Sequence, residues 1–151
     1  MTHSGDRDLS PVTILVIGTC PWDAKTENMM TDKELVLKFI DEVFNAHDLT
    51  KLNDFMREDY RQHSIEAKDG REGFREFAEG FFQSEPYMDV KQIFESDDHM
   101  VAVFFKCSFK NGSAAKVVDM YRIEDGKLAE HWDVVQLLPE DDGRINGHGS
   151  F

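Results

Sequence analysis

Residues 117–137 read VVDMYRIEDGKLAEHWDVVQL, and this stretch decides the fold of the chain. Two runs rich in β-branched and aromatic residues flank the segment EDGK, a pattern typical of a β-hairpin. The first run carries Asp119, and the second carries His131 and Asp133. Charged groups inside a β-run are costly unless they are paired, solvated or used, so these three side chains are candidate site residues.

The length of the turn decides which side chains share a face of the hairpin. A two-residue loop, Asp125-Gly126, would place Asp119 opposite Trp132 and turn Asp133 to the other face. Such a loop would remove the argument for a pair of carboxylates.

The alternative is a three-residue loop, Glu124–Gly126, closed by a glycine bulge. It would place Asp119 opposite His131 and bring Asp133 onto the same face. We expect this loop, because the two acidic residues suit the helical positions of a type I turn and the glycine suits the left-handed position after them.

The composition indicates one soluble globular domain. The 151 residues are 31% charged and 40% hydrophobic, and the net charge of −13 argues against nucleic acid and anionic membranes as partners. The two cysteines, Cys20 and Cys107, form neither a disulfide framework nor a zinc pattern. We therefore expect a reducing, cytoplasmic location.

Residues 1–29 differ from the rest and are expected to be an extension outside the domain. The apolar run 12–18 is too short to cross a bilayer. Asp6 and Asp8 offset Arg7 before this run, which makes a poor signal peptide. An added strand and a loosely held extension both remain open for this segment.

Three helices are predicted between residues 31 and 86. The first begins at a capping box, Thr31-Asp32-Lys33-Glu34, the second covers residues 49–56, and the third runs from Asp69-Gly70 to Pro86. Apolar residues recur at helical spacing in the first (Val36, Phe39, Ile40, Val43, Phe44), the second (Leu49, Leu52, Phe55, Met56) and the third (Phe74, Phe77, Ala78, Phe81, Phe82).

Alternating patterns predict antiparallel strands after the helices. They cover residues 88–96, 100–110 and the hairpin 117–137, and the polar, glycine-rich residues 139–151 are expected to be a flexible tail. The order of elements predicts an α+β fold, a curved antiparallel sheet wrapped around the N-terminal helices. A pocket at the open end of this half-barrel would be lined by Asp119, His131 and Asp133.

From residue 30 to 138 the sequence resembles the SnoaL-like polyketide cyclases, a branch of the nuclear-transport-factor-2-like (ketosteroid-isomerase-like) superfamily of conical α+β barrels. The resemblance rests on three motifs: Tyr60-x-Gln62-His63, the segment DGREGF at residues 69–74, and above all residues 119–134, which read DMYRIEDGKLAEHWDV.

This resemblance implies a homodimer that works without a metal or organic cofactor. It also implies that an aspartate on the final strand acts as acid and base, and this position is Asp133. The preceding strand supplies a partner that is often histidine in the cyclases, and the matching position here is Asp119.

The side chains suggest how such a site would work on a carbonyl compound. Two carboxylates on one apolar face repel, so one of them should hold a proton near neutral pH. His131 could orient Asp133 or donate to a developing oxyanion. We expect His63, Tyr60 and Tyr121 to contact the ligand; the alternative for His63 is a histidine hydrogen-bonded at the end of a strand.

Three functional hypotheses follow. The first is a cofactor-free acid/base enzyme, an aldol cyclase or a related lyase or isomerase, acting on a small apolar or carbonyl compound. The second is a non-catalytic ligand-binding or dimerising module. The third is a metal site built from His63, His131 and Asp133. The carboxylates favour the enzyme, and no serine or cysteine nucleophile motif or phosphate loop competes with it.

Overall fold

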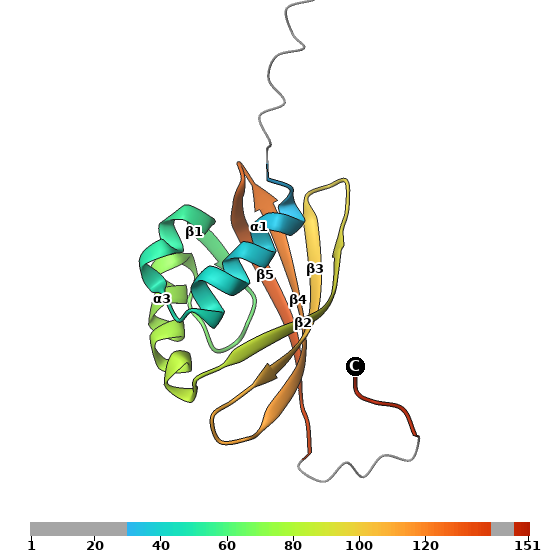
Figure 1. Cartoon of the computed structure of the whole chain (residues 1–151). Helices are drawn as coiled ribbons and strands as arrows, with labels where there is room; N and C mark the ends of the chain where they lie inside the picture. The colour runs from blue at the N-terminus through green and yellow to red at the C-terminus, as the bar shows by residue number, and fades with distance from the viewer. Residues whose placement is uncertain (1–29, 140–146) are drawn as a thin grey trace, which may run out of the picture.

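The computed structural model describes residues 30–139 and 147–151. Figure 1 shows the order of the elements along the chain. The helical segments are α1 (Asp32–Phe39), the π-helical turn Ile40–Asn45, the 3-10 turn Leu49–Lys51, α2 (Leu52–Phe55), α3 (Gly70–Phe81) and the 3-10 turn Phe82–Ser84. The strands are β1 (Met56–Gln62), β2 (Tyr87–Glu95), β3 (Met100–Ser108), β4 (Ala114–Glu124) and β5 (Lys127–Leu137).

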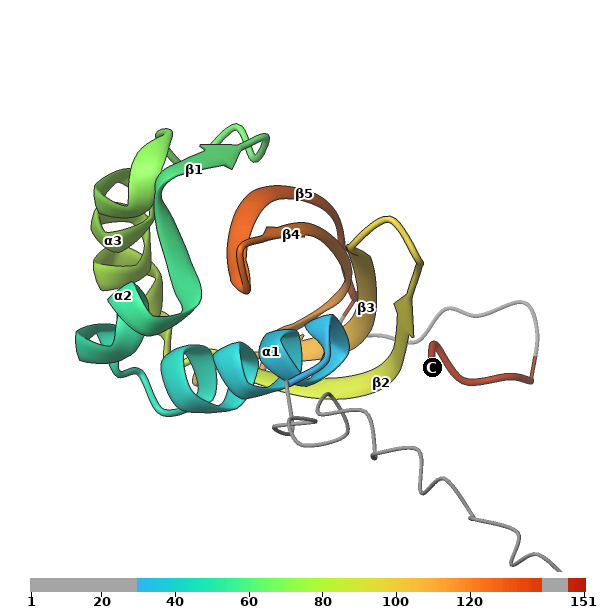
Figure 2. The same cartoon turned by 90° about the horizontal axis from the view of Figure 1, so that it is seen from above.

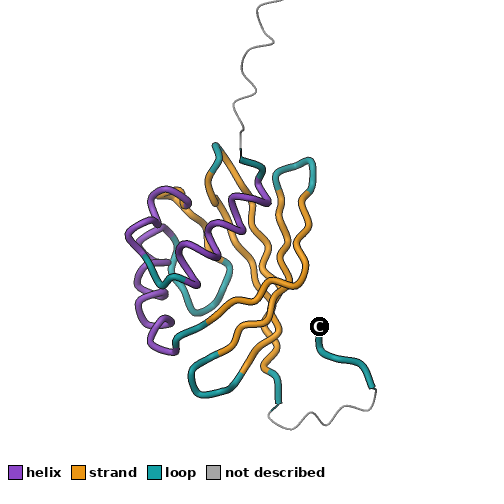
Figure 3. Tube along the Cα trace, in the orientation of Figure 1, coloured by secondary structure: helices purple, strands orange, loops and turns teal. Residues whose placement is uncertain are grey.

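The five strands form one curved sheet in the order β1-β5-β4-β3-β2. Seen from above, the sheet curls around α1 and leaves a gap between its two edges (Figure 2). The helices lie on one side of the strands, as the colouring by secondary structure also shows (Figure 3). The predicted α+β half-barrel is therefore confirmed.

The first helix begins where the sequence predicts. The Thr31 hydroxyl accepts from the Glu34 amide at 3.1 Å, and the Glu34 carboxylate accepts from the Thr31 amide at 2.9 Å. These bonds satisfy amide groups that a helix N-terminus otherwise leaves unpaired. Val36 and Phe39 on this helix are fully buried and form part of the core against the concave face of the sheet.

The sheet is mixed, whereas the prediction was purely antiparallel. The segment after α2, for which the sequence predicted no strand of the sheet, is β1, and it runs parallel to β5 at the edge of the sheet. Met56 belongs to this strand and not to the helix before it. The pairing brings Arg61 opposite Glu130 and Gln62 opposite His131. A parallel contact between segments so far apart in the chain has no local sequence signal.

The predicted turn of the β4–β5 hairpin is wrong. Glu124 pairs with Lys127 across a two-residue loop, and Asp125 and Gly126 both have positive φ, 53° and 69°. This is the combination that a type I′ hairpin turn requires, and its twist matches that of the strands.

The same-face prediction nevertheless holds, because β5 contains a bulge. The register shifts between Arg122, which pairs with Glu130, and Ile123, which pairs with Leu128, so Ala129 is the extra residue. Leu128 and Ala129 are accordingly buried side by side. The two-residue turn alone would place Asp133 on the opposite face from Asp119. The extra residue of the bulge brings both side chains back to the same face.

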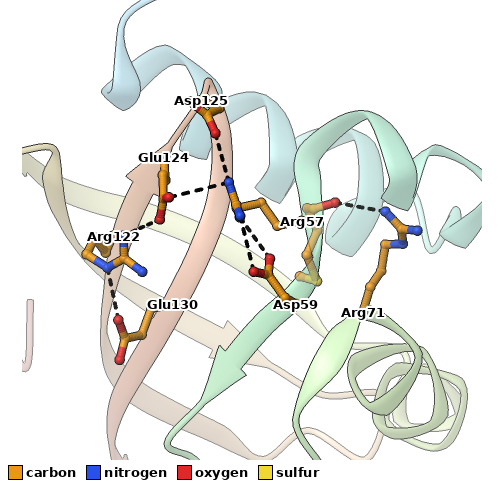
Figure 4. A network of polar contacts seen from close by, with 8 residues as sticks. Arg57, Asp59, Arg71, Arg122, Glu124, Asp125 and Glu130 are labelled. Atoms are coloured by element: carbon orange, nitrogen blue, oxygen red, sulfur yellow. Dashed lines mark hydrogen bonds and ion pairs between the residues drawn. The ribbon is translucent and has the colours of Figure 1, made fainter.

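A network of charged side chains ties the tip of this hairpin to β1 (Figure 4). Arg57 on β1 donates to both carboxylate oxygens of Asp59, at 2.8 and 3.1 Å, and to Asp125 at 2.9 Å. Arg122 on β4 donates to Glu124 at 2.8 Å and to Glu130 at 2.9 Å. The pairing of β1 with β5 is interrupted between Met56 and Arg61. The ionic contact between Arg57 and Asp125 holds the edge strand to the hairpin there.

The predicted terminal segments are only partly described. Residues 1–29, with Cys20, lie outside the described residues, as do residues 140–146 of the predicted tail. Residues 147–151 form no helix or strand, and the ring of Phe151 lies 5.7 Å from that of Phe104 on β3. In the described part of the chain, no helix has the length and apolar character needed to cross a membrane.

Candidate functional site

A cavity of about 520 Å³ opens between the concave face of the sheet and α3. Its volume lies in the range of small-molecule sites. One end is walled by apolar side chains, including Phe77, Phe81, Phe105, Phe109 and Val117. The other end presents polar groups from three strands: Tyr60 and Gln62 of β1, Asp119 and Tyr121 of β4, and His131 and Asp133 of β5.

The predicted triplet of Asp119, His131 and Asp133 lines this cavity together. The exact pairing differs from the prediction: Asp119 lies opposite Asp133, and His131 lies opposite Tyr121. The two carboxyl groups therefore stand on neighbouring strands at the same level of the sheet.

Asp119 is buried and held by its neighbours. Its Oδ2 accepts a hydrogen bond from the Tyr121 hydroxyl at 2.9 Å and lies 3.5 Å from Nε2 of His131. Burial, followed by the negative charge of Asp119, keeps the pKa of Tyr121 well above its usual value, so the phenol keeps its proton and donates. Tyr121, predicted to contact the ligand, thus uses its hydroxyl to anchor Asp119.

Asp133 differs from Asp119 in having no hydrogen-bond or ion-pair partner among the described residues. It is partly exposed to the cavity, with apolar side chains such as Val117 and Val135 on the same face. A carboxylate in this position is available to accept a proton from a bound molecule.

Tyr60 offers a second group without a protein partner. Its side chain is buried at the cavity wall, and its hydroxyl bonds to no other described residue. Burial, together with the charges of Asp119 and Asp133, raises its pKa well above the usual value. The phenol therefore stays protonated and can donate a hydrogen bond to a ligand oxygen.

Gln62 belongs to this cluster, although the sequence placed it only in a family motif and not among the candidate site residues. Its Oε1 lies 2.8 Å from Nδ1 of His131 and also accepts from the Ser64 amide at 3.1 Å. His131 Nε2 is buried and makes no hydrogen bond, since its 3.5 Å contact with Asp119 is too long or misaligned for one. The motif Tyr60-x-Gln62 was visible, but its placement depends on the parallel pairing of β1 with β5.

His63 lies at the rim of the cavity and is tied to the outer face of the sheet. Its ring stacks on Trp132 at 4.7 Å with an interplanar angle of 6°, and its Nε2 is 2.9 Å from Oε1 of Glu130. Trp132 and Glu130 thus lie on the outer face, opposite to the face that carries His131 and Asp133. The alternative interpretation of His63, a histidine hydrogen-bonded at the end of a strand, describes it better than ligand contact.

The metal site proposed from His63, His131 and Asp133 does not form in residues 30–139 and 147–151, where no three His, Cys, Asp or Glu side chains are grouped to hold an ion. The hydrogen bonds of His63 and His131 explain this, since each ring is turned to a different partner.

The model of the SnoaL-like polyketide cyclases matches residues 34–140. The chain belongs to this family. No curated protein matches the chain significantly.

Solved structures place this SnoaL-like chain among proteins of the same fold. Wild-type IdmH of Streptomyces antibioticus is 21% identical, with a TM-score of 0.57, over 70% of this chain and 91% of IdmH. A SnoaL-like polyketide cyclase of Agrobacterium tumefaciens strain C58 is 20% identical, with a TM-score of 0.60, over 72% and 93%. An NTF2-like protein of unknown function from Cytophaga hutchinsonii is 18% identical, with a TM-score of 0.59, over 71% and 91%.

Proposed function

We propose that this SnoaL-like protein is a cofactor-free acid/base enzyme that acts on a small carbonyl compound. One observation carries the proposal: Asp133 has no partner among the described residues, lines a largely apolar cavity and shares it with the protonated hydroxyl of Tyr60. Family membership supports a cyclase or isomerase as the general class.

In the first step, Asp133 takes a proton from the carbon next to the substrate carbonyl. The electron pair of the broken C–H bond moves to the carbonyl oxygen and forms an enolate. The Tyr60 hydroxyl can donate to this oxygen and stabilise its charge. Positioned acid/base groups of this kind contribute roughly 100- to 10,000-fold to a rate.

The second step depends on what the enolate meets. In an isomerisation, Asp133 returns the proton to another carbon of the substrate. In an aldol cyclisation, the enolate carbon attacks a second carbonyl of the same molecule, a C–C bond forms, and Asp133 gives its proton to the new alkoxide. One carboxyl group thus serves both steps, and no redox partner is needed.

The charges of the cavity favour a neutral substrate. Its lining includes Asp119, Asp133 and Glu66, while no arginine or lysine of the described residues reaches it. A carboxylate or phosphate would enter this negative, partly apolar space at a cost in desolvation and repulsion. The expected substrate is therefore a neutral, largely apolar molecule with a carbonyl group at one end.

Proton exchange in D₂O tests the proposal without knowledge of the natural product. A panel of apolar ketones is incubated with the protein, and NMR follows the exchange of hydrogens on the carbon next to the carbonyl. Exchange should be accelerated, should disappear in Asp133→Asn and should persist in Asp97→Asn, which changes an exposed turn residue. Ketones that bind without exchanging would favour the ligand-binding module instead.

A further inference from the structure

The side chain of Gln62 determines which nitrogen of His131 carries a proton. The amide group of Gln62 has one atom 2.8 Å from Nδ1 of His131 and 3.1 Å from the backbone nitrogen of Ser64. The Ser64 N–H can only donate, so the atom between them must be the carbonyl oxygen of Gln62. Because this oxygen can only accept, Nδ1 of His131 must be the protonated nitrogen.

This assignment leaves Nε2 as the unprotonated nitrogen, beside Asp119. Nε2 is buried, has no hydrogen-bond partner among the described residues and lies 3.5 Å from Oδ2 of Asp119. The same oxygen already accepts from the Tyr121 hydroxyl. A lone pair on Nε2 would lie close to a negatively charged carboxylate oxygen, and one proton placed on either group removes that repulsion.

The opposite arrangement would disable the site. If Nδ1 lost its proton and Nε2 kept one, Nδ1 and the oxygen of Gln62 would face each other as two acceptors. The ring would then turn or shift, and Nε2 would no longer lie beside Asp119. The Ser64–Gln62–His131 chain prevents this with two hydrogen bonds.

We propose that Gln62 is a positioning residue that fixes His131 in the Nδ1–H form, so that the lone pair of Nε2 is left for a proton shared with Asp119. This proposal rests on the proposed function only for its effect on turnover. Gln62 does not touch the reacting atoms; it acts through His131 and takes its own orientation from the Ser64 amide.

The test is NMR of protein labelled with ¹⁵N in histidine, at a pH at which the ring is neutral. Long-range hydrogen–nitrogen correlations distinguish the Nδ1–H from the Nε2–H form. The signals of His131 are identified by their loss in His131→Gln. The wild type should show the Nδ1–H form, and Gln62→Leu, which removes the acceptor, should show a mixture or the Nε2–H form.

Gln62→Glu is the matched control, because a carboxylate oxygen still accepts from both Ser64 and His131. It should keep the Nδ1–H form, and its proton exchange on ketones should fall less than the loss of about tenfold or more expected for Gln62→Leu. An Nε2–H form in the wild type would overturn the proposal, as would an unchanged tautomer in folded Gln62→Leu.

The two proposals can fail separately. The tautomer of His131 could change in Gln62→Leu although the wild type exchanges no hydrogens of any ketone. This result would support the role of Gln62 and contradict the proposed function. If Gln62→Leu does not fold, the spectra of the wild type and of Gln62→Glu still test the proposal, because both proteins must show His131 in the Nδ1–H form.

Discussion

Asp119 and Asp133 lie directly opposite each other on β4 and β5, yet of the two only Asp119 has a partner among the residues that the structure describes. Tyr121 donates to Asp119, and His131 lies beside it, while Asp133 is partnered by no described residue. Two carboxyl groups of equal chemistry thus have unequal surroundings: Asp119 is held by its neighbours, and Asp133 is the one that we propose to meet the substrate.

Asp133→Asn should reduce proton exchange by at least roughly 100-fold, since an amide of the same shape cannot accept the proton. His131→Gln should lose less, because it removes a neighbour of Asp119 and leaves the base. Asp119→Asn should lie between them, since the amide disturbs the anchor of His131 and Tyr121 without removing Asp133. Rates of exchange by NMR give the order, and circular dichroism checks the fold. Full activity in Asp133→Asn would show that another residue is the catalytic base.

Glu130→Gln should destabilise the protein in a manner that depends on pH. Hydrogen bonds from His63 and then from Arg122 lower the pKa of Glu130 below 4.5. A carboxylate whose folded pKa is depressed stabilises the protein above its unfolded pKa, and this contribution is lost as the pH falls through the folded value. Urea unfolding should show a difference between wild type and variant at pH 7 that shrinks below pH 4.5.

Glu79→Gln is the control for that experiment, because Glu79 is exposed on α3 and its carboxylate has no partner among the described residues. It should change the free energy of unfolding little at any pH. A Glu130→Gln effect that stays constant from pH 7 to low pH would contradict the ionic explanation.

Cys107 should react slowly with thiol reagents in the folded protein. Burial, followed by the negative charge of Asp119, raises the pKa of its thiol to about 11 from 9.0. Two pH units correspond to roughly 100-fold less thiolate, the reactive form. Labelling of a Cys20→Ser variant, with and without urea, measures this directly. Rapid labelling of the folded variant would show that the cavity wall opens often.

Gly73→Ala and Gly80→Ala should have opposite effects although both lie in α3. A Cβ atom on Gly73 would approach the carbonyl carbon of Lys68 to 2.7 Å, whereas Gly80 has no neighbour within 4 Å. We expect Gly73→Ala to cost about 1–3 kcal/mol, because the helix and the loop before it must separate. Gly80→Ala should stabilise by about 0.5–1 kcal/mol through lower chain entropy. Thermal unfolding of the pair measures both, and equal effects would refute the close contact.

A protein that begins at Met30 should unfold with nearly the same free energy as the full chain. The capping box at Thr31 starts α1 without help from earlier residues. A loss of more than about 2 kcal/mol, the worth of burying one or two large side chains, would mean that residues 12–16 pack on the domain. Denaturant unfolding of the two proteins measures this difference in the free energy of unfolding.

The parts of the fold that follow from local chemistry were predictable. The capping box at Thr31, the phenylalanine stripe of α3 and the alternation in β3 each report a short-range preference. The parallel position of β1 was not, since the contact between Gln62 and His131 joins segments far apart in the sequence. A strand of mostly polar residues at a sheet edge carries little hydrophobic pattern.

The candidate site was predicted in composition but not in detail. The sequence identified Asp119, His131 and Asp133, and their common face is confirmed for a reason other than the expected one. A two-residue turn followed by a one-residue bulge places the same side chains on the cavity face as a three-residue turn does. The sequence pattern therefore could not distinguish the two arrangements. The catalytic roles of these side chains stay predictions.

The bulge at Ala129 also bears on how relatives of this chain should be compared. The segment between Gly126 and His131 contains one residue more than a regular hairpin with this turn would need. A relative that keeps the two-residue turn but lacks the extra residue would turn its acidic and imidazole groups to the outer face of the sheet. A one-residue gap at this point in an alignment therefore marks a change of face, unless the loop of the relative is one residue longer.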